Sequence, residues 1–347
     1  MKKNFWIGLV LAGVLLSGLP AFAAGPSELR VVGSWNSLTM FKNFEQPFWT
    51  EVVPKELGIK TSLTSLGQVN LKGPAVLRSM SMGVYDVVHT VADYVVDDSP
   101  ALAGLDLPAL ANDLELARKV VDAYTPVLDE YLAKDFKVKL LSVVPYPAQV
   151  LFSNVPIKGL ADLKGKKIRA SGWTTSEFVT ALGATGVTLA FSEVPQALQR
   201  GVVDGAVTGS LSGFSAGWGE VSKYVYPLPI GGWDYVIGTI SLDTWKSMTP
   251  DQQAKLQRLI KEKLEKPAWE VTGRETKEGI ACLSGSGACP HGTPAKVEVI
   301  PVTAGDEKAA RAVLVNNVLP AWSKKVDAGT VRKWNESIGK LVGIEAK

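Results

Sequence analysis

Two stretches of this sequence, far apart along the chain, have the same form. Residues 29–35 (LRVVGSW) are a short apolar strand pattern that runs into a glycine and a tryptophan, and residues 167–173 (KIRASGW) repeat it. Each is followed by a helix pattern that ends at a glycine and leads into a second strand pattern, over residues 77–88 and 198–207. This repeat predicts two similar α/β lobes with a cleft between them. Short units of this kind recur in unrelated folds, so chance similarity is the alternative.

The chain length also favours two lobes. A chain of 347 residues exceeds the roughly 250–300 residues beyond which chains divide into domains. Residues 137–153 form one long apolar strand pattern, but Pro145 and Pro147 interrupt it. A central strand would not tolerate these prolines, whereas a bent connection between lobes would. We expect the chain to cross between the lobes here and to cross back within residues 224–242.

The first residues have the pattern of an export signal. Lys2 and Lys3 precede an apolar run over residues 5–16, and small residues follow at positions 21–23 (AFA). A retained anchor is the alternative, but the run is shorter than the ~20 residues of a spanning helix. No cysteine follows to accept a lipid. We predict that residues 1–23 are a cleavable signal peptide and that the protein is periplasmic.

Arg169 is the strongest candidate for a ligand-binding residue. Residues 166–170 have a strand pattern, and Ser171 and Gly172 turn the chain into a helix pattern. Arg169 therefore lies at the carboxyl end of a strand, the edge that borders the ligand crevice in open α/β sheets. A guanidinium there can hold a carboxylate through two parallel hydrogen bonds. A solvated surface arginine is the alternative.

Three sequence blocks carry a resemblance to a known family. They are residues 162–169 (DLKGKKIR), 190–194 (AFSEV) and 197–205 (ALQRGVVDG). In this order and spacing they resemble the solute receptors of tripartite ATP-independent periplasmic (TRAP) transporters, and the likeness extends from about residue 29 to about residue 260. The resemblance implies that Arg169 binds the substrate carboxylate.

The same resemblance implies the architecture and the partners. It implies an α/β, two-lobed periplasmic binding protein fold with hinge strands and a long lobe-spanning helix, which fits the capping pattern Thr249-Pro250-Asp251-Gln252 and the apolar spacing after it. We expect lobe I to comprise residues 24–147 plus about 236–275, and lobe II residues 148–235 plus about 276–347. The implied partners are one small and one large integral membrane subunit, powered by an ion gradient.

Three positions near the expected site bear on the ligand. Gln149 stands where many relatives have a second basic residue, and its neutral amide favours a ligand with one carboxylate. Thr208 stands where the family usually has an asparagine, which puts the substrate class in doubt. The family often lays the equivalent of Phe191 against the ligand, although core packing explains that residue equally well. Ser192 is expected to cap a helix that begins at Glu193.

Aromatic residues gather near the predicted cleft. Trp35 and Asn36 follow the first repeated strand, and Trp35 suits either stacking on a ligand or packing under the loop. The other candidates for an aromatic wall are Trp173, Trp218, Trp233 and Tyr235. Such a wall favours an apolar or aromatic acid, since unpaired hydroxyls of a sugar acid would be costly to bury. The alternative is that these aromatics fill the core, and we expect at most two of them to contact a ligand.

The two cysteines are expected to form a disulfide. Cys282 and Cys289 bracket a flexible segment, and an oxidising compartment favours their pairing. A zinc site that combined both thiols with His291 would lack a clear fourth ligand. We predict no metal and no cofactor.

The residue content favours a receptor over an enzyme. His89 and His291 are the only two histidines, neither has a recognisable catalytic partner, and the chain contains neither a Gly-x-Ser-x-Gly elbow nor a phosphate-binding glycine loop. A formal net charge of +3 gives no case for nucleic acid. We predict a monomeric receptor that captures a small organic carboxylate, most simply a monocarboxylate such as an aromatic or 2-oxo acid. An exported enzyme acting on a small acid, a receptor of an ATP-driven importer and an exported interaction module are the alternatives.

Overall fold

Two β-sheets organise the residues that the computed structural model describes, which are 25–69, 71 and 73–347. The predicted signal peptide, residues 1–23, lies outside these residues. The first sheet has the strand order β2-β1-β3-β10-β4. Its strands are β1 (Glu28–Gly33), β2 (Lys60–Ser65), β3 (Val87–Val91), β4 (Val138–Val144) and β10 (Val236–Ser241).

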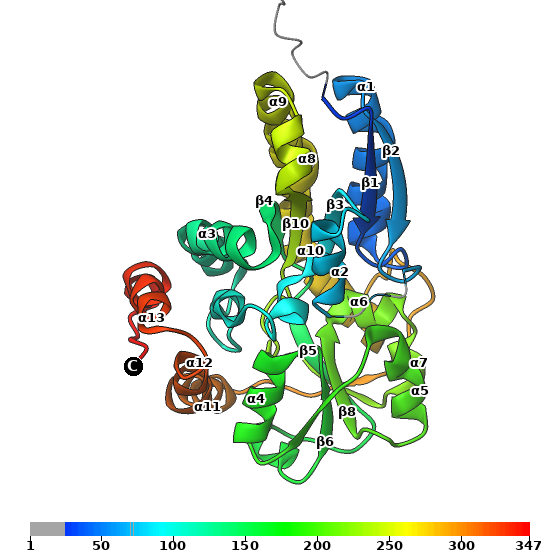
Figure 1. The fold of residues 1–347 in the computed structure, drawn as a ribbon. Coiled ribbons are helices and arrows are strands. Elements are labelled where there is room, and N and C mark those ends of the chain that lie inside the picture. Colours follow the sequence, from blue (N-terminus) through cyan, green and yellow to red (C-terminus); the bar gives the residue numbers. More distant parts are fainter. Residues whose placement is uncertain (1–24, 70, 72) are drawn as a thin grey trace, which may run out of the picture.

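The second sheet has the strand order β11-β9-β5-β8-β6-β7. Its strands are β5 (Gln149–Ser153), β6 (Lys167–Ala170), β7 (Thr185–Thr188), β8 (Gly205–Gly209), β9 (Tyr224–Tyr226) and β11 (Glu298–Val299). Helices flank both sheets, and the two sheets lie at opposite ends of the molecule (Figure 1). The predicted α/β fold with two lobes is confirmed.

The two sheets repeat one arrangement. In the first, β1 pairs in parallel with β2 and β3, and β3 pairs antiparallel with β10. In the second, β6 pairs in parallel with β7 and β8, and β8 pairs antiparallel with β5. The repeated sequence stretches form β1 and β6, so equivalent strand ends face the junction of the lobes.

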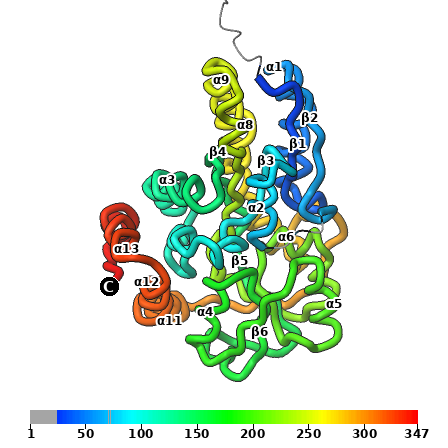
Figure 2. Tube along the Cα trace, in the orientation of Figure 1, coloured from blue at the N-terminus to red at the C-terminus, as the bar shows by residue number. Residues whose placement is uncertain are grey.

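The chain crosses between the sheets where the prolines predicted it. β4 belongs to the first sheet and β5 to the second (Figure 2). The return crossing runs from β9 to β10. The two crossings are hydrogen-bonded to each other, because the amides of Tyr146 and Gln149 donate to the carbonyls of Trp233 and Gly232, each at 3.0 Å. These paired crossings form the hinge between the lobes.

A long helix extends across both lobes. Its successive parts are α9 (Pro250–Ile260), the π-helical turn η7 (Lys261–Glu265) and α10 (Lys266–Ser284). The predicted capping box is present, since the Thr249 hydroxyl accepts from the Gln252 amide and the Gln252 side chain accepts from the Thr249 amide. α9 contacts α1 (Val53–Leu57) and β4 of the first lobe, whereas α10 packs on α6 (Ser210–Ser215) of the second. Pro267 does not end the helix, and the π-helical turn immediately precedes it.

One local prediction in the second lobe is wrong. α6 and α7 (Trp218–Val221) follow β8. α10 approaches α6 closely, since a Cβ at Gly279 of α10 would lie 2.3 Å from the Leu211 amide nitrogen. Ser192 caps no helix; it lies inside the short helix η6 (Phe191–Glu193), and the Ala190 amide donates to the Glu193 carboxylate instead.

The remaining helices cover the faces of the sheets. In the first lobe these are η1 (Met40–Glu45), η2 (Phe48–Val52), α1, α2 (Ala75–Ser81), η3 (Ala92–Val95), η4 (Pro100–Leu105), α3 (Leu114–Phe136) and α8 (Leu242–Ser247). In the second lobe they include η5 (Leu160–Leu163), α4 (Trp173–Ala181) and α5 (Val194–Gln199). The predicted disulfide is present and joins Cys282, in the last turn of α10, to Cys289.

The C-terminal helices contact both lobes. They are α11 (Ala304–Val313), η8 (Leu314–Val318), α12 (Leu319–Ser323), α13 (Ala328–Trp334), η9 (Asn335–Gly339) and α14 (Lys340–Val342). η8 packs on α4 of the second lobe, whereas the indole N–H groups of Trp322 and Trp334 donate to the carbonyls of Pro100 and Gly104 in the first. The lobe boundaries therefore stay a prediction, and these contacts favour grouping the end of the chain with both lobes.

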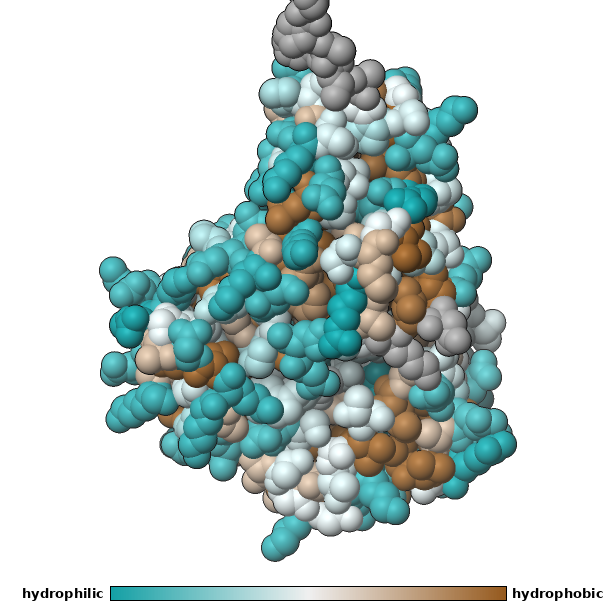
Figure 3. Space-filling model, in the orientation of Figure 1, coloured by the Kyte–Doolittle hydropathy of each residue, from teal (hydrophilic) through white to brown (hydrophobic). Residues whose placement is uncertain are grey.

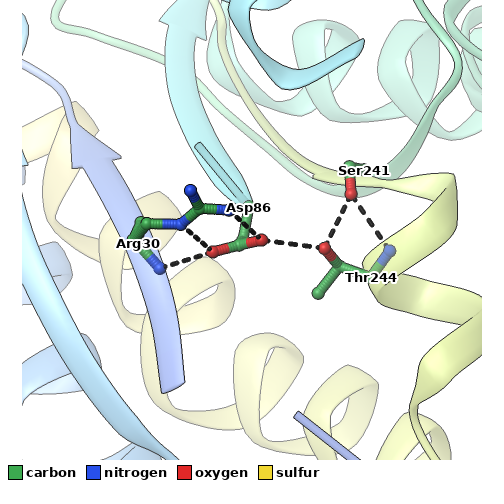
Figure 4. A network of polar contacts seen from close by, with 4 residues as sticks. All are labelled: Arg30, Asp86, Ser241 and Thr244. Carbon is green, nitrogen blue, oxygen red and sulfur yellow. Dashed lines mark hydrogen bonds and ion pairs between the residues drawn. The ribbon is translucent and has the colours of Figure 1, made fainter. Parts of the chain in front are cut away.

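An ion-pair network fixes the edge of the first lobe that faces away from the crossings. Arg30 on β1 donates from Nε and Nη2 to the two carboxylate oxygens of Asp86, at 2.9 and 3.1 Å. Thr244 on α8 donates to the same carboxylate at 3.0 Å and is bonded to Ser241 (Figure 4). β1, the start of β3 and α8 are thereby tied together.

The outer surface carries both polar and apolar regions. Apolar residues gather above and below the level at which the two lobes meet, while polar residues cover the flank formed by the C-terminal helices (Figure 3). Within the described part of the chain, no helix combines the length and the apolar character needed to cross a membrane.

Candidate ligand-binding site

Two cavities lie where the lobes meet. The outer chamber has a volume of about 650 Å³ and is lined by residues of both lobes, among them Leu66, Val69 and Asp97 of the first and Ser171, Thr188 and Glu193 of the second. The inner cavity has a volume of about 20 Å³ and lies beside Arg169. Trp35, Tyr94 and Phe191 line both cavities, so these three aromatic side chains form a wall between them.

Arg169 is buried at the inner cavity. Its side chain, on β6, is 1 % exposed, and its guanidinium donates from Nε to the Leu189 carbonyl at 3.1 Å and from Nη1 to the Val207 carbonyl at 2.8 Å. Among the described residues, no carboxylate is hydrogen-bonded to it. The two carbonyls fix the plane of the guanidinium, and the Tyr94 side chain interacts with it as well. A ligand anion could accept from its other N–H groups in a site removed from solvent.

Gln149 and Thr208 line the same cavity as Arg169. They lie on the neighbouring strands β5 and β8, whose antiparallel register pairs Val150 with Thr208. The side-chain nitrogen of Gln149, Nε2, donates to the Pro147 carbonyl at 3.0 Å. The side-chain oxygen, Oε1, is therefore the group available to the cavity. The fold thus brings Gln149, Arg169 and Thr208 together, although Gln149 and Thr208 are 59 positions apart in the sequence.

The aromatic wall is built around Trp35. Its ring centroid lies 5.6 Å from that of Tyr94, 5.9 Å from that of Phe191 and 6.3 Å from that of Tyr146. Behind Phe191 lies Trp218, whose ring is fully buried and faces Arg169 at 5.8 Å. The wall therefore joins β1 of one lobe to η6 of the other.

A buried polar cluster holds the strand end that carries Trp35. The Ser34 amide donates to Glu45 Oε2 at 2.6 Å, and Glu45 Oε1 lies 3.5 Å from Nδ1 of His89. Burial raises the pKa of Glu45 to about 7, opposed by the hydrogen bond from Ser34, and burial lowers the pKa of His89 to about 3. His89 accepts from the Trp49 indole at Nε2, which places its proton on Nδ1, facing Glu45. His89 is thus a neutral structural residue.

The other expected site residues lie elsewhere. Asn36 is exposed and lines neither cavity, and Trp173 lines only the outer chamber, where Lys325 lies 4.9 Å from its ring. Trp233 and Tyr235 are core residues: the Trp233 indole donates to the Ala111 carbonyl at 3.0 Å and the Tyr235 hydroxyl to the Ala117 carbonyl at 3.5 Å. The return crossing turns these two rings into the first lobe, away from the cavities.

Asp93 and Tyr94 are site residues that the sequence reasoning missed. Asp93 accepts from the Ser171 hydroxyl at 3.3 Å and from the Thr174 hydroxyl at 3.2 Å, so it connects η3 of the first lobe to the start of α4 in the second. Burial raises the pKa of Asp93 to about 6 against these hydrogen bonds. A signal was present, because both residues follow the carboxyl end of β3, the edge that borders a ligand crevice.

Asp234 is a further residue that the sequence did not reveal. It lines the inner cavity, and its backbone has a φ of 46°, which is uncommon for a residue other than glycine. Its amide donates to the Asp106 carboxylate at 2.6 Å. Burial raises the pKa of Asp234 well above its ordinary value, the neighbouring Asp93 and Asp106 raise it further, and Arg169 opposes them.

The fold and this site define a class of protein: receptors in which two α/β lobes, joined by paired crossings, close around a small solute. Within the described part of the chain, no group of His, Cys, Asp and Glu side chains is arranged to hold a metal ion. The family model for bacterial extracellular solute-binding proteins, family 7, matches residues 59–287, and the chain belongs to this family. The resemblance to TRAP solute receptors is confirmed. The family and the fold are those of transport receptors.

Similar proteins include sequence relatives and solved structures. The uncharacterised protein YiiZ of Salmonella typhimurium is 28 % identical over 80 % of this chain and 85 % of its own length. A TRAP periplasmic solute-binding protein from Desulfovibrio salexigens, solved with orotic acid, has a TM-score of 0.79 at 20 % identity over 91 % of this chain and 99 % of that one. DctP7 of Bordetella pertussis, which binds pyroglutamic acid, has a TM-score of 0.77 at 23 % identity over 90 % and 99 %. These structural likenesses show the fold.

Proposed function

We propose that this protein is the periplasmic receptor of a TRAP transporter and that it captures a small organic monocarboxylate through Arg169. The observation that carries the proposal is the environment of that arginine: it is buried between the lobes, hydrogen-bonded to no carboxylate among the described residues, and beside a cavity. A buried guanidinium without a hydrogen-bonded anion is costly, and a ligand carboxylate would supply that anion. Gln149 adds no second cation, which favours one carboxylate.

The cavity sizes indicate how such a ligand would sit. About 20 Å³ holds little more than one water molecule. About 650 Å³ lies within the range of ligand pockets, roughly 300–1,000 Å³. The ligand body would therefore occupy the outer chamber, whose walls include Leu66, Val69 and Leu71, and its carboxylate would pass the aromatic wall to reach Arg169. Those apolar walls favour an apolar or aromatic acid.

Capture would proceed by closure of the lobes about the paired crossings. A ligand that contacts both lobes stabilises the closed form by its differential affinity for the two states. The receptor would be exported by the signal peptide of residues 1–23 and would act as a monomer. It would release the unaltered acid to one small and one large membrane subunit that an ion gradient powers.

A melting-temperature screen tests the proposal. Aromatic acids, 2-oxo acids, sugar acids and dicarboxylates are added to the purified protein, because a ligand that binds only the folded state raises its melting temperature. We expect at least one monocarboxylate to do so without being chemically converted. In Arg169→Ala the rise should vanish, although the free variant should also melt somewhat lower because two carbonyls lose their donor.

Arg30→Ala is the matched control for this screen. Arg30 is also a strand arginine, and its loss breaks the ion pair with Asp86, but it lies outside both cavities. We expect the control to keep the ligand-induced rise. If Arg169→Ala kept it too, or if every hit were turned over, the proposed function would be wrong.

A further inference from the structure

The inner cavity is lined by polar groups that the protein leaves without partners. Among the described residues, the Gln149 amide oxygen, the hydroxyls of Thr208 and Ser212, and the Asp234 carboxylate accept no hydrogen bond. The buried Tyr146 hydroxyl also lines this cavity, beside the Ser34 hydroxyl. Buried polar groups are normally satisfied, so this set indicates a ligand that supplies several partners.

The Asp234 side chain is held at the cavity by an unusual turn. Asp106 accepts from the amides of Trp233, at 3.1 Å, and Asp234, at 2.6 Å. Gly232 precedes them with a φ of 70°, and a Cβ there would lie 2.2 Å from the Asp106 carboxylate. The left-handed backbone of Asp234 costs free energy, and such positions cluster at functional sites.

The inner cavity therefore pairs a guanidinium with a carboxyl group. Arg169 suits a carboxylate, whereas Asp234 on the same cavity would repel one once it is ionised. Of the other nearby carboxyl groups, Asp93 is bonded to Ser171 and Thr174 across the lobe junction, and Asp106 to the amides of Trp233 and Asp234. A ligand that carried only a carboxylate would leave Asp234 unmatched. One that also carried an N–H donor would satisfy both side chains.

We propose that the residues lining the inner cavity, once the lobes open to admit a ligand, recognise an acid that bears an ammonium or a ring or amide N–H group next to its carboxylate. The carboxylate binds Arg169, and the N–H group donates to Asp234 and to the Gln149 amide oxygen. This inference rests on the proposed function and narrows its ligand to amino acids, their cyclic derivatives and related N–H acids. Asp234 is then the residue that separates such ligands from plain carboxylic acids.

The protonation of Asp234 gives the proposal a distinct signature. The groups that face Asp234 are Arg169, Asp93 and Asp106, with Tyr94 on the same wall. Burial and the two acidic neighbours favour neutral Asp234 in the empty site. A ligand ammonium would favour the ionised form, so its binding should release a proton. A plain carboxylate would cancel the charge of Arg169 and should release none.

The test uses pairs of acids of equal size that differ in the nitrogen. Proline and pyroglutamate are compared with cyclopentanecarboxylate, and phenylalanine with 3-phenylpropionate, by calorimetry near neutral pH in two buffers of different ionisation enthalpy. We expect the nitrogen-bearing member of at least one pair to bind 10-fold or more tightly than its partner. Binding of an ammonium ligand should release a proton.

Asp234→Asn supplies the matched variant. Asparagine tolerates a positive φ, so the turn should survive, but it cannot become an anion. We expect the preference to fall below about threefold and the proton release to vanish. Asp98→Asn, which removes a carboxylate outside both cavities, should change neither.

The possible results distinguish a failure of this inference from a failure of the proposed function. Equal or tighter binding of the plain acids, or a preference that survives in Asp234→Asn, would overturn this inference and leave the proposed function standing. Binding of no acid at all would overturn both. The proton measurement on the unaltered protein decides the matter even if Asp234→Asn does not fold.

Discussion

The two equivalent strands β1 and β6 each carry an arginine, and the two arginines differ in burial and in hydrogen-bond partners. Arg30 on β1 has a side chain that is 47 % exposed, and Asp86 engages it with both carboxylate oxygens. Arg169 on β6 is 1 % exposed and donates to two carbonyls, and no carboxylate among the described residues is hydrogen-bonded to it. Arg30 therefore has its carboxylate partner within the protein, whereas Arg169 has no hydrogen-bonded carboxylate partner at its cavity. A residue's partners, more than its type or strand, separate a structural arginine from a binding one.

The tryptophans of the two repeated stretches differ in the same way. Trp35, after β1, contacts Tyr94 and Phe191 and lines both cavities. Trp173, at the start of α4, lines only the outer chamber. The repeat thus places an arginine of one lobe and a tryptophan of the other at one inner site.

Replacing each arginine by lysine should give the largest contrast. Arg169→Lys keeps the charge but loses the planar fork, and we expect affinity for the bound acid to fall about 100-fold, since truncating a buried charged hydrogen-bonding pair costs ~2–5 kcal/mol. Arg30→Lys should leave affinity unchanged and cost less than ~1 kcal/mol of stability, because its ion pair is half exposed. Calorimetry and thermal melts measure both. Equal losses of affinity in the two variants would erase the distinction drawn between the strands.

Removing each tryptophan ring should give a smaller contrast. Trp35→Ala would open the wall between the cavities, and we expect affinity for a small acid to fall about 10-fold, or ~1.4 kcal/mol, through lost burial and stacking. Trp173→Ala should lower it less than about threefold. Titrations of both variants with the same acid test this order. The reverse order would place the ligand wholly in the outer chamber.

The smallest expected effect is the pH dependence of closure through Asp93. Burial raises its pKa to about 6 in the structure, and the pKa should return to its ordinary value of roughly 4 when the lobes separate. The closed form therefore holds the proton more tightly. Its advantage is full below about pH 4 and is lost as the pH rises through 6.

Asp93→Asn should remove this dependence, since it cannot ionise. Discounting for partial exposure, we expect the closed-to-open ratio of the unaltered protein to fall about fivefold from pH 5 to pH 8. Fluorescence energy transfer between labels on the two lobes measures that ratio. Because Asp234 titrates in the same direction, the informative quantity is the difference between the unaltered protein and the variant. Identical pH profiles would rule out a contribution from Asp93.

Much of the scaffold followed from local sequence signals. Pro145 and Pro147 located a crossing, and the Thr249 capping box located the start of the long helix. α6 was not predicted from the sequence, because this helix depends on packing against α10, which no local pattern reveals.

The sequence alone determined the two α/β lobes, the family and the arginine at the strand end, because these depend on periodicity, prolines and spacing along the chain. Tertiary structure decided which side chains meet at the cavities. It sent Trp233 and Tyr235 into the core and Asp234 to Arg169, because that turn is shaped by hydrogen bonds to Asp106, more than 100 residues earlier. The direction of a side chain on a turn is set by φ and by distant partners, and neither is encoded in the neighbouring residues.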